Sequence, residues 1–355
     1  MDKYRIDSHK LIYHVDRVNS WLKGENIYPI YIEISASGAC NHRCVYCALD
    51  FMEYKPRLLD SFMLKKRLKE MARLGVKSVM FAGEGEPLMH KNIAEIINHA
   101  KKWGIDVALT TNGVLLTPRV IDKTLANITW IKVSINAATQ ETYSKIHRTS
   151  RADFDKVIAN MSYAARLRKK NGYSCTLGMQ LVLLPENCHE AASLAKIAKD
   201  IGMDYLVIKP YSQHPSSKTT RYKDIKYSKY LTLAKKLQGF NDKKFNVIFR
   251  INTMKKWDQA KRDYRCCGAL PFWAYIDAGA NVWGCSAYLG DKRFLYGNIN
   301  KEPFKAIWEG GDRKASLELA ASRLDVKKCR VNCRMDEVNR YLWELKNPPA
   351  HVNFI

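Results

Sequence analysis

Apolar, strand-like runs alternate with amphipathic helical runs along the first two thirds of the chain. The predicted strands cover residues 29–35, 77–82, 105–111, 129–136, 174–184 and 204–210. The predicted helices cover residues 59–74, 91–103, 117–126, 153–170 and 190–201. Strands that alternate with helices at this spacing predict a parallel sheet with crossover helices. We therefore expect an α/β fold, a partial (β/α)6 TIM-type barrel, with its active site at the carboxyl ends of the strands.

The alternation stops after Pro210, and the rest of the chain has a different character. Residues 211–265 are rich in lysine, arginine and tyrosine, and they predict a basic linker segment with one helix and one strand. From residue 266 onward we expect a small cysteine-rich α+β module with a hairpin and three helices. The predicted organisation is therefore an N-terminal lead-in over 1–27, a barrel over 28–210, the linker over 211–265 and an auxiliary domain over 266–355.

The bulk composition is that of a globular protein, with 46% hydrophobic and 26% charged residues in 355. No apolar run approaches the ~20 residues that cross a bilayer, and the N-terminus lacks the apolar core of a signal peptide. We therefore expect a cytoplasmic protein with no membrane association. Ten cysteines in such a chain favour metal binding or catalysis over a disulfide framework. Cys175 and Cys188 stand apart from the others and are interpreted as packing residues.

The formal net charge is +24, from 59 lysines and arginines against 35 acidic residues. Such an excess favours polyanionic partners, namely nucleic acid, nucleotides or phosphorylated sugars. A lysine-rich surface that serves only solubility explains the charge equally well. The net charge alone therefore does not distinguish a protein with a polyanionic partner from one with a merely soluble basic surface.

Three cysteines, Cys40, Cys44 and Cys47, lie at CxxxCxxC spacing in the loop that leaves the first predicted strand. Three thiolates so close together can hold three irons of a cubane iron–sulfur cluster. The fourth iron then lacks a protein thiolate and is free to bind a ligand, as in an open catalytic metal site. A zinc knuckle, or three unrelated buried thiols, is the alternative, although zinc sites usually use two pairs of ligands.

Glycines and polar side chains mark the ends of the next three predicted strands. The second strand ends in Gly83, Glu84, Gly85, Glu86 and Pro87. Glycine permits close backbone approach, and a carboxylate beside exposed backbone can receive an ammonium group. The third strand ends at Thr111 and Asn112, and the fourth contributes Ser134 and Asn136. Ordinary turn chemistry is the alternative explanation for these polar residues.

The cysteine triad, with Tyr46 immediately before its third cysteine, and the Gly83–Pro87 turn resemble the signature of the radical S-adenosylmethionine (radical SAM) superfamily. The resemblance covers about residues 28–210, and Glu84 departs from the glycine that the family often has. It implies a SAM-binding 4Fe–4S cluster on the triad and the SAM amino group at the Gly83–Pro87 turn. It also implies contacts to the rest of SAM from Tyr46, Thr111, Asn112, Ser134, Asn136, Gln180 and Val182, with Arg148 as a salt-bridge partner of the SAM carboxylate.

A second group of cysteines lies in the last quarter of the chain, at Cys266, Cys267, Cys285, Cys329 and Cys333. The group resembles the twitch or abbreviated SPASM extension of some radical SAM enzymes. That resemblance implies one auxiliary 4Fe–4S cluster. We favour Cys267 over Cys266 as a ligand because it leads directly into the predicted hairpin strand. A structural zinc ion held by four of these cysteines is the alternative.

By resemblance, the protein is an enzyme that cleaves SAM reductively to a 5′-deoxyadenosyl radical, which abstracts hydrogen from a substrate. The net reaction is a dehydrogenation, epimerisation, isomerisation or elimination, and the electron comes from a reductant such as flavodoxin or ferredoxin. His214, after the sixth strand, is the predicted catalytic residue. The expected substrate is anionic, with a nucleotide-linked or phosphorylated sugar favoured. The alternatives are a nucleobase in DNA or RNA, a ribosomally made peptide, and a non-enzymatic iron–sulfur or zinc nucleic-acid-binding protein.

Overall fold

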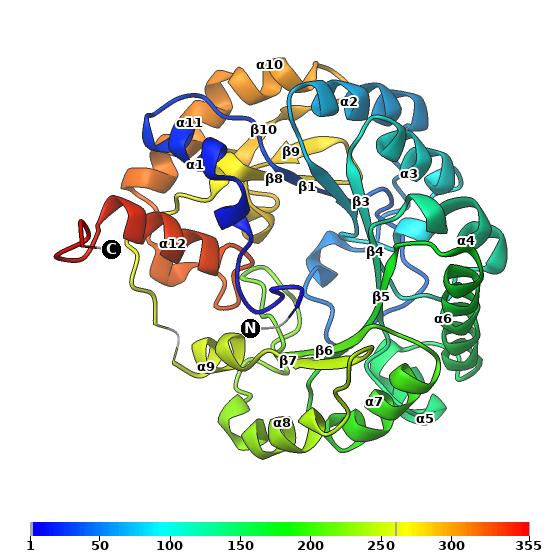
Figure 1. Cartoon of the computed structure of the whole chain (residues 1–355). Coiled ribbons are helices and arrows are strands. Elements are labelled where there is room, and N and C mark those ends of the chain that lie inside the picture. Colours follow the sequence, from blue (N-terminus) through cyan, green and yellow to red (C-terminus); the bar gives the residue numbers. More distant parts are fainter. Residues whose placement is uncertain (1–2, 260, 355) are drawn as a thin grey trace.

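A computed structural model describes residues 3–259 and 261–354 of the chain. Its centre is one ten-stranded sheet, with strand order β10-β9-β8-β1-β2-β3-β4-β5-β6-β7 (Figure 1). Every neighbouring pair from β8 through β7 in this order is parallel, and β8, β9 and β10 form antiparallel pairs. The strands are β1 (Tyr31–Ile34), β2 (Ser78–Phe81), β3 (Asp106–Thr111), β4 (Trp130–Ser134), β5 (Thr176–Val182), β6 (Tyr205–Lys209), β7 (Asn246–Phe249), β8 (Trp273–Ile276), β9 (Asn281–Trp283) and β10 (Leu295–Asn298).

Helices lie on both sides of the curved sheet: most cover its convex outer face, and α12 lies on its inner, open side (Figure 1). They are α1 (Val15–Leu22), α2 (Ser61–Arg73), α3 (Ile93–Lys102), α4 (Pro118–Thr124), α5 (Gln140–His147), α6 (Ala152–Asn171), α7 (Ala191–Asp200), α8 (Leu231–Gln238), α9 (Ile251–Gln259), α10 (Phe304–Glu309), α11 (Gly311–Ser322) and α12 (Asp336–Lys346). The main hydrophobic core fills the space between strands and helices. Alternate residues of each strand enter it, as Ile131 and Val133 do in β4. The intervening residues face the inside of the barrel.

The mixed α/β, partial-barrel class expected from the sequence is confirmed, but the parallel part of the sheet is larger than six strands. Strand β7 lies in the segment expected to be a linker, and it pairs in parallel with β6. Strand β8 comes from the cysteine-rich region and pairs in parallel with β1, Tyr31 opposite Trp273. This pairing joins residues about 240 positions apart. Local hydrophobic periodicity therefore could not predict it. The cysteine-rich region is therefore built onto the edge of the barrel sheet.

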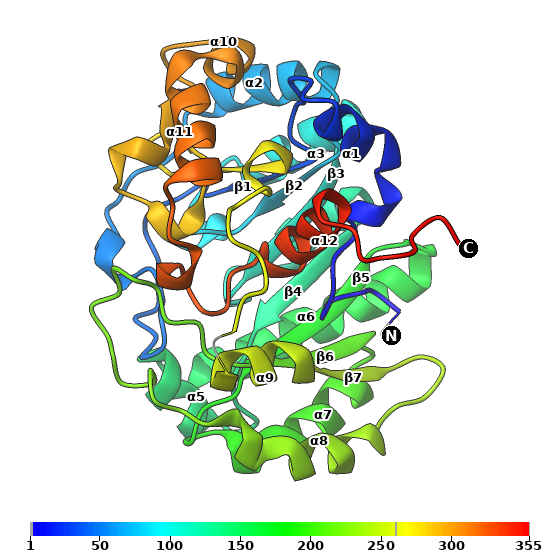
Figure 2. The same ribbon diagram turned by 90° about the vertical axis from the view of Figure 1, so that its left-hand side faces the viewer.

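The inner, open side of the curved sheet is covered by the N-terminal region and by α12 (Figures 1 and 2). Leu11, Val18, Phe272 and Leu342 form a small hydrophobic cluster there, which joins α1, α12 and the segment before β8. Among the helices described, none combines the length and the apolar content that crossing a lipid bilayer requires.

Candidate active site

The loop with the first three cysteines follows β1 and is fixed to the end of α5. The backbone N–H of Arg43 donates to the carbonyl of His147 (3.1 Å), and that of Val45 donates to the carbonyl of Ile146 (2.9 Å). The Arg43 guanidinium folds back over the loop and donates to the carbonyl of Cys40 (2.6 Å). These bonds hold an irregular loop in one conformation at the carboxyl end of the sheet.

Cys40, Cys44 and Cys47 are free and half-buried, as metal ligands in a loop should be. Burial raises the pKa of the Cys40 thiol to about 12, and the nearby Glu86 carboxylate adds to the shift. Burial also raises the pKa of Cys44, and the charges of the two other cysteines raise it further. Three thiolates in this pocket therefore need a positive centre. A 4Fe–4S cluster supplies one, so the donor set fits that group.

His147 contacts the middle cysteine, a relation that sequence reasoning missed. Its Nδ1 lies 3.2 Å from Cys44 Sγ, and its Nε2 lies 2.9 Å from the carbonyl oxygen of Ile135. Because a carbonyl only accepts, Nε2 carries the proton and Nδ1 accepts from the thiol. Burial lowers the pKa of His147 to about 3, so the ring is neutral. The two residues are 103 positions apart, and no local pattern marks the contact.

Within the described residues, one group of ligand atoms is close enough to hold a single metal ion. Atoms of His42, Cys44 and His147 lie within 4.8 Å of one another. This arrangement would leave out Cys40 and Cys47. A cluster on the three cysteines would instead use the whole loop.

The turn over residues 83–87 packs directly against the start of the cysteine loop. A Cβ on Gly85 would lie 2.3 Å from the carbonyl oxygens of Ser37 and Ala39, far inside van der Waals contact. The next residue, Glu86, donates its backbone N–H to Ala39 (2.8 Å). Glycine is therefore required at position 85 by the close approach of two backbones. The two motifs found in the sequence form one unit of structure.

The two glutamates of this turn have different surroundings. The buried Glu86 carboxylate accepts hydrogen bonds from Thr111 Oγ1 (2.6 Å), the Asn112 N–H (2.8 Å) and the Leu88 N–H (3.1 Å). Both its oxygens therefore bind the protein, and the side chain ties the end of β2 to the end of β3. Glu84 accepts from the Ala278 N–H (2.9 Å) through Oε1. Its buried Oε2 has no hydrogen-bond partner within the described residues.

The predicted contacts for the rest of SAM gather at the ends of β4 and β5. Asn136 Oδ1 accepts from the Val182 N–H (2.7 Å), and Asn136 Nδ2 donates to the Tyr46 hydroxyl. Gln180 Nε2 donates to Ser134 Oγ (3.2 Å). Asn112 reaches back to Asn41 in the cysteine loop (2.7 Å). Arg148 is exposed at the end of α5, where its backbone is left-handed (φ 48°).

His214 is buried and fully engaged with the protein, so the structure does not support the catalytic role expected for it. Its Nδ1 accepts from the Ser216 N–H (3.0 Å), and its Nε2 donates to the Ser286 carbonyl (2.9 Å). The ring stacks on Phe51, with centroids 4.5 Å apart. Burial lowers its pKa to about 4. Both ring nitrogens are occupied, and His214 holds together segments 50–52, 212–219 and 285–288.

The later cysteines divide into a group of four and an outlier. Burial raises the pKa of Cys267, Cys285 and Cys333, and each is raised further by the charges of other cysteines of the group, Cys329 included. Cys266 contributes to the shift of its neighbour Cys267 and is not among the main causes for Cys285 or Cys333. Asn339 of α12 donates to Cys267 Sγ (3.5 Å), and the Tyr288 hydroxyl lies 3.2 Å from Cys329 Sγ. Four half-buried thiols in one region, two of them with polar partners, suit a bound metal or cluster.

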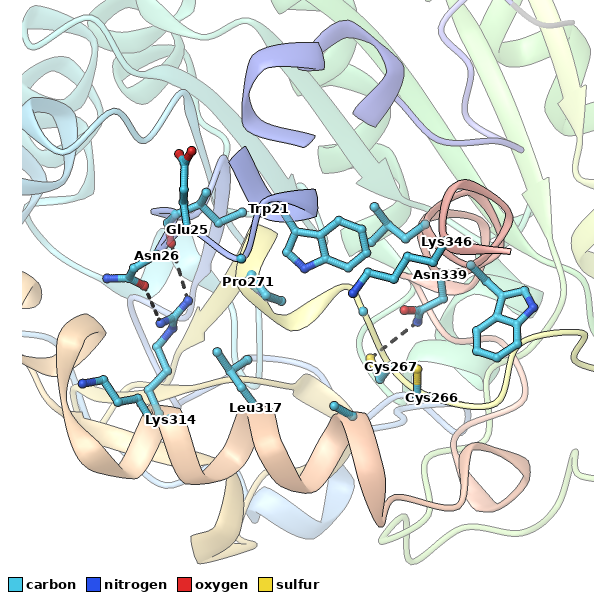
Figure 3. Close-up of a pocket in the computed structure, with 17 residues that line it drawn as sticks. Trp21, Glu25, Asn26, Cys266, Cys267, Pro271, Lys314, Leu317, Asn339 and Lys346 are labelled. Atoms are coloured by element: carbon cyan, nitrogen blue, oxygen red, sulfur yellow. Dashed lines mark hydrogen bonds between the residues drawn. The ribbon is translucent and has the colours of Figure 1, made fainter. Parts of the chain in front are cut away.

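A cavity of about 410 Å³ lies beside these cysteines (Figure 3). Trp21 of α1, Leu317 of α11 and Lys346 of α12 line it, together with Cys266 and Cys267. None of the residues expected to contact SAM lines this cavity, so it is separate from the site at the end of the barrel.

The cysteine-rich region also contacts the carboxyl rim of the barrel. Asn332 Nδ2 donates to the Tyr211 carbonyl (2.6 Å), and the Arg330 guanidinium donates to the Ser212 carbonyl (3.2 Å). Asp50, just beyond the cysteine triad, accepts from the backbone N–H groups of Lys218 and Thr219 (2.8 Å each). Both cysteine groups therefore border the same end of the sheet.

Comparison with known proteins identifies the family of the barrel domain, which the geometry alone does not name. The model of the radical SAM superfamily matches residues 34–198. The chain contains a radical SAM domain. A radical SAM domain binds SAM and a 4Fe–4S cluster, and the proteins with this domain that the chain resembles are enzymes.

Two curated relatives show how far the similarity extends. The chain is 28% identical to GTP 3′,8-cyclase of Chlorobaculum tepidum over 201 residues, 54% of this chain and 57% of that protein. The match thus spans little more than half the length of that relative. It is 25% identical to AdoMet-dependent heme synthase of Methanosarcina barkeri over 307 residues, 80% of this chain and 83% of that protein.

Solved structures share the fold at lower sequence identity. SuiB of Streptococcus suis bound to S-adenosylmethionine superimposes with a TM-score of 0.63 over 84% of this chain and 70% of its own, at 17% identity. The enzyme anSMEcpe with bound AdoMet gives a TM-score of 0.58 over 82% of this chain and 84% of its own, at 19% identity. These likenesses establish the partial barrel with a C-terminal extension.

Proposed function

We propose that the protein is a radical SAM enzyme, with its SAM-binding cluster on Cys40, Cys44 and Cys47. The observation that carries the proposal is the contact of Gly85 with the backbone of residues 37–39. It places the turn assigned to the SAM amino group directly against the loop assigned to the cluster. Cys40, Cys44 and Cys47 would hold a 4Fe–4S cluster, and that cluster would supply the electron for reductive cleavage of SAM and thus for radical abstraction of hydrogen from the substrate.

The residues of the chain position SAM and exclude water. The backbone of the Gly83–Pro87 turn faces the methionine end, and the free Glu84 Oε2 is the better candidate than Glu86 to accept from the amino group. Tyr46, Asn136 and Val182 form the wall assigned to the nucleoside end. Ser134 and Gln180 add hydroxyl and amide groups beside it. Arg148 is exposed, so its proposed pairing with the SAM carboxylate requires its side chain to turn toward the site.

We assign an auxiliary 4Fe–4S cluster to Cys267, Cys285, Cys329 and Cys333. Their mutual electrostatic effects and their burial support the assignment. Residues 266–355 then form the auxiliary, SPASM- or twitch-like unit, joined to the barrel of residues 28–210 through the pairing of β8 with β1. The same four thiols would also suit zinc, so iron content is the discriminating quantity.

For the substrate, we propose an anionic small molecule, a nucleotide-linked or phosphorylated sugar. The net charge of +24 supports an anion, and the similarity to a GTP 3′,8-cyclase supports a nucleotide. A ribosomally made peptide is the competing class, because SuiB has been solved with its precursor peptide SuiA. That likeness is at 17% sequence identity and extends to the fold alone. Modification of a nucleobase in DNA or RNA is the third class.

Production of 5′-deoxyadenosine tests this substrate assignment. Anaerobically reconstituted protein would receive SAM and a strong reductant, with nucleotide sugars, DNA, RNA or a peptide pool in separate tubes. We expect a rise above the substrate-free background only with nucleotide sugars. A rise only in the nucleic-acid or peptide tube would replace the proposed substrate class while leaving the radical chemistry in place.

A further inference from the structure

Two lysines lie on the inner wall of the barrel, where the proposed function would place a substrate. In β4, Ile131 and Val133 enter the core under the helices, so Lys132 between them faces inward. In β6, Leu206 and Ile208 enter that core, so Lys209 faces inward. Both lysines are half-buried rather than solvated. Inward-facing lysines are uncommon in a barrel, because burying an ammonium group is costly.

Neither ammonium group has a counter-ion within residues 3–259 and 261–354. No ion pair or hydrogen bond to a protein acceptor involves Lys132 or Lys209, and Lys132 only lies 5.5 Å above the Trp130 ring. Two acidic side chains are paired with arginines: Asp7 with Arg250 (3.2 Å) and Glu33 with Arg334. Among the described residues, no ion pair therefore compensates the charge of Lys132 or Lys209.

The surrounding charges increase this positive excess. Burial lowers the pKa of Lys132 to about 8, and Arg250 contributes to the shift. Burial likewise lowers the pKa of Lys209, with further contributions from Lys132, Arg250 and Arg330. The three charged groups that contribute most to the Lys209 pKa are thus all positive. An anion placed among these groups would raise the pKa of both lysines, because it would favour the charged form of each.

Polar groups beside the lysines suit a ligand with hydroxyl groups. Thr110 of β3 lies opposite Lys132 in the strand register. Ser134 and Gln180, farther along the same inner face, are joined by a hydrogen bond of 3.2 Å. Gly178, opposite Lys132 on β5, leaves room for the Tyr205 ring, whose atoms would lie 2.1 Å from an added Cβ. The wall therefore offers cations, hydroxyl groups and an aromatic ring.

We propose that Lys132 and Lys209, with Arg330 at the rim, form the subsite for the phosphate or diphosphate group of the substrate. The inference rests on the proposed function, because it names the residues that would bind the anionic part of that substrate. Lysines bind phosphate as compact point charges. The carboxylate of SAM offers a related negative charge, so the test has to separate these two sources.

The probe is inorganic pyrophosphate, titrated by calorimetry into cluster-reconstituted, SAM-saturated protein under anaerobic conditions. We expect Lys132→Met and Lys209→Met each to weaken pyrophosphate binding about tenfold or more, since each removes a charge-assisted hydrogen bond. Lys123→Met is the matched control, because Lys123 is exposed on α4, in the outer layer of helices. It should bind pyrophosphate as the wild type does, and all three variants should bind SAM normally.

Several outcomes would overturn the proposal. One is no pyrophosphate binding by the wild type, and another is equal affinity in wild type and in both inner-wall variants. Weaker SAM binding in these variants would assign the lysines to the SAM carboxylate instead. If Lys209→Met fails to fold, Lys209→Arg retains the charge and should retain pyrophosphate binding. Failure of the proposed function is seen separately, as wild-type protein that binds pyrophosphate but neither binds nor cleaves SAM.

Discussion

At the scale of single residues, the geometry of the site depends on a few close contacts. Adding one side-chain atom, or removing one hydrogen bond, would change that geometry. Gly85 allows two backbones to meet, and Glu86 ties the ends of β2 and β3 through two hydrogen bonds, from Thr111 and from Asn112. The glycine could be recognised in the sequence as a place where backbone can approach closely, but the segment that approaches it could not. The roles of the two glutamates could not, because they depend on which carboxylate oxygens meet donors from distant segments.

Replacing Gly85 by alanine should disturb the cysteine loop. The new Cβ would overlap the carbonyl oxygens of Ser37 and Ala39, so one of the two loops must move. We expect a loss of about 1–3 kcal/mol in the free energy of unfolding, the usual cost of overpacking, and weaker SAM binding. Denaturant unfolding and equilibrium SAM binding would measure both effects.

Gly311→Ala is the control for this change, because no atom lies within 4 Å of the Cβ it would add. Gly311 begins α11, far from the cysteine triad in the sequence. Unchanged stability and SAM affinity in Gly85→Ala would show that the two loops do not depend on this close contact.

Which of the adjacent residues Cys266 and Cys267 is a ligand of the proposed auxiliary cluster can also be tested by single substitutions. Cys267 and the charges of Cys285, Cys329 and Cys333 act on one another, whereas Cys266 is a main cause only for the pKa of Cys267. Wild-type protein should hold about eight irons as two cubane clusters. Cys267→Ser should lower the iron content to about four, and Cys266→Ser should leave it near eight.

Iron and sulfide analysis of anaerobically reconstituted protein, with zinc measured in the same samples, checks this assignment. About four irons and one zinc in the wild type would replace the auxiliary cluster by a structural zinc site. Loss of iron on Cys266→Ser alone would reverse the choice between the two adjacent cysteines.

At the scale of elements, three segments from distant parts of the chain meet at His214. Phe51 follows the cysteine triad, Ser216 follows β6, and Ser286 follows the third cysteine of the second group. The position of His214 after a strand could be read from the sequence, and it suggested catalysis. The sequence could not show that both ring nitrogens are used by backbone groups, because Ser286 lies 72 residues away.

Removing the His214 ring should therefore weaken the fold. We expect His214→Ala to lower the free energy of unfolding at pH 7.5 by about 2 kcal/mol or more, through two lost hydrogen bonds and a cavity. The wild-type histidine stays neutral down to about pH 4, against an ordinary value of 6.5. The unfolded chain thus binds the extra proton between these two values, and this contribution to stability is lost as the pH falls from 6.5 to 4.

Denaturant unfolding of both proteins from pH 5 to 7.5 checks this prediction, with the difference between them expected to shrink toward pH 5. The pH profile of SAM cleavage in His214→Ala should keep the wild-type shape. A profile that loses one limb, with stability unchanged, would restore a catalytic role to His214.

At the scale of the whole molecule, one sheet joins the barrel and the cysteine-rich region. The six barrel strands and the helices α2, α3, α4, α6 and α7 were predictable because alternating apolar and amphipathic runs mark each of them locally, whereas the short α5 was not predicted. The pairing of β8 with β1 was not, because it depends on the return of the chain after more than 230 residues. That return brings the loops at Cys285 and Cys329 to the same rim as Cys40, so two groups of cysteines lie at one end of the barrel.

The most direct test of the central claim is 5′-deoxyadenosine formation by reconstituted protein with SAM and a strong reductant, without substrate. We predict a measurable background in the wild type that disappears in the combined Cys40→Ala, Cys44→Ala, Cys47→Ala variant. It should remain in Cys188→Ala, a control outside both cysteine groups. Its absence from cluster-loaded wild-type protein, or its persistence in the triple variant, would contradict the assignment of radical SAM chemistry to these three cysteines.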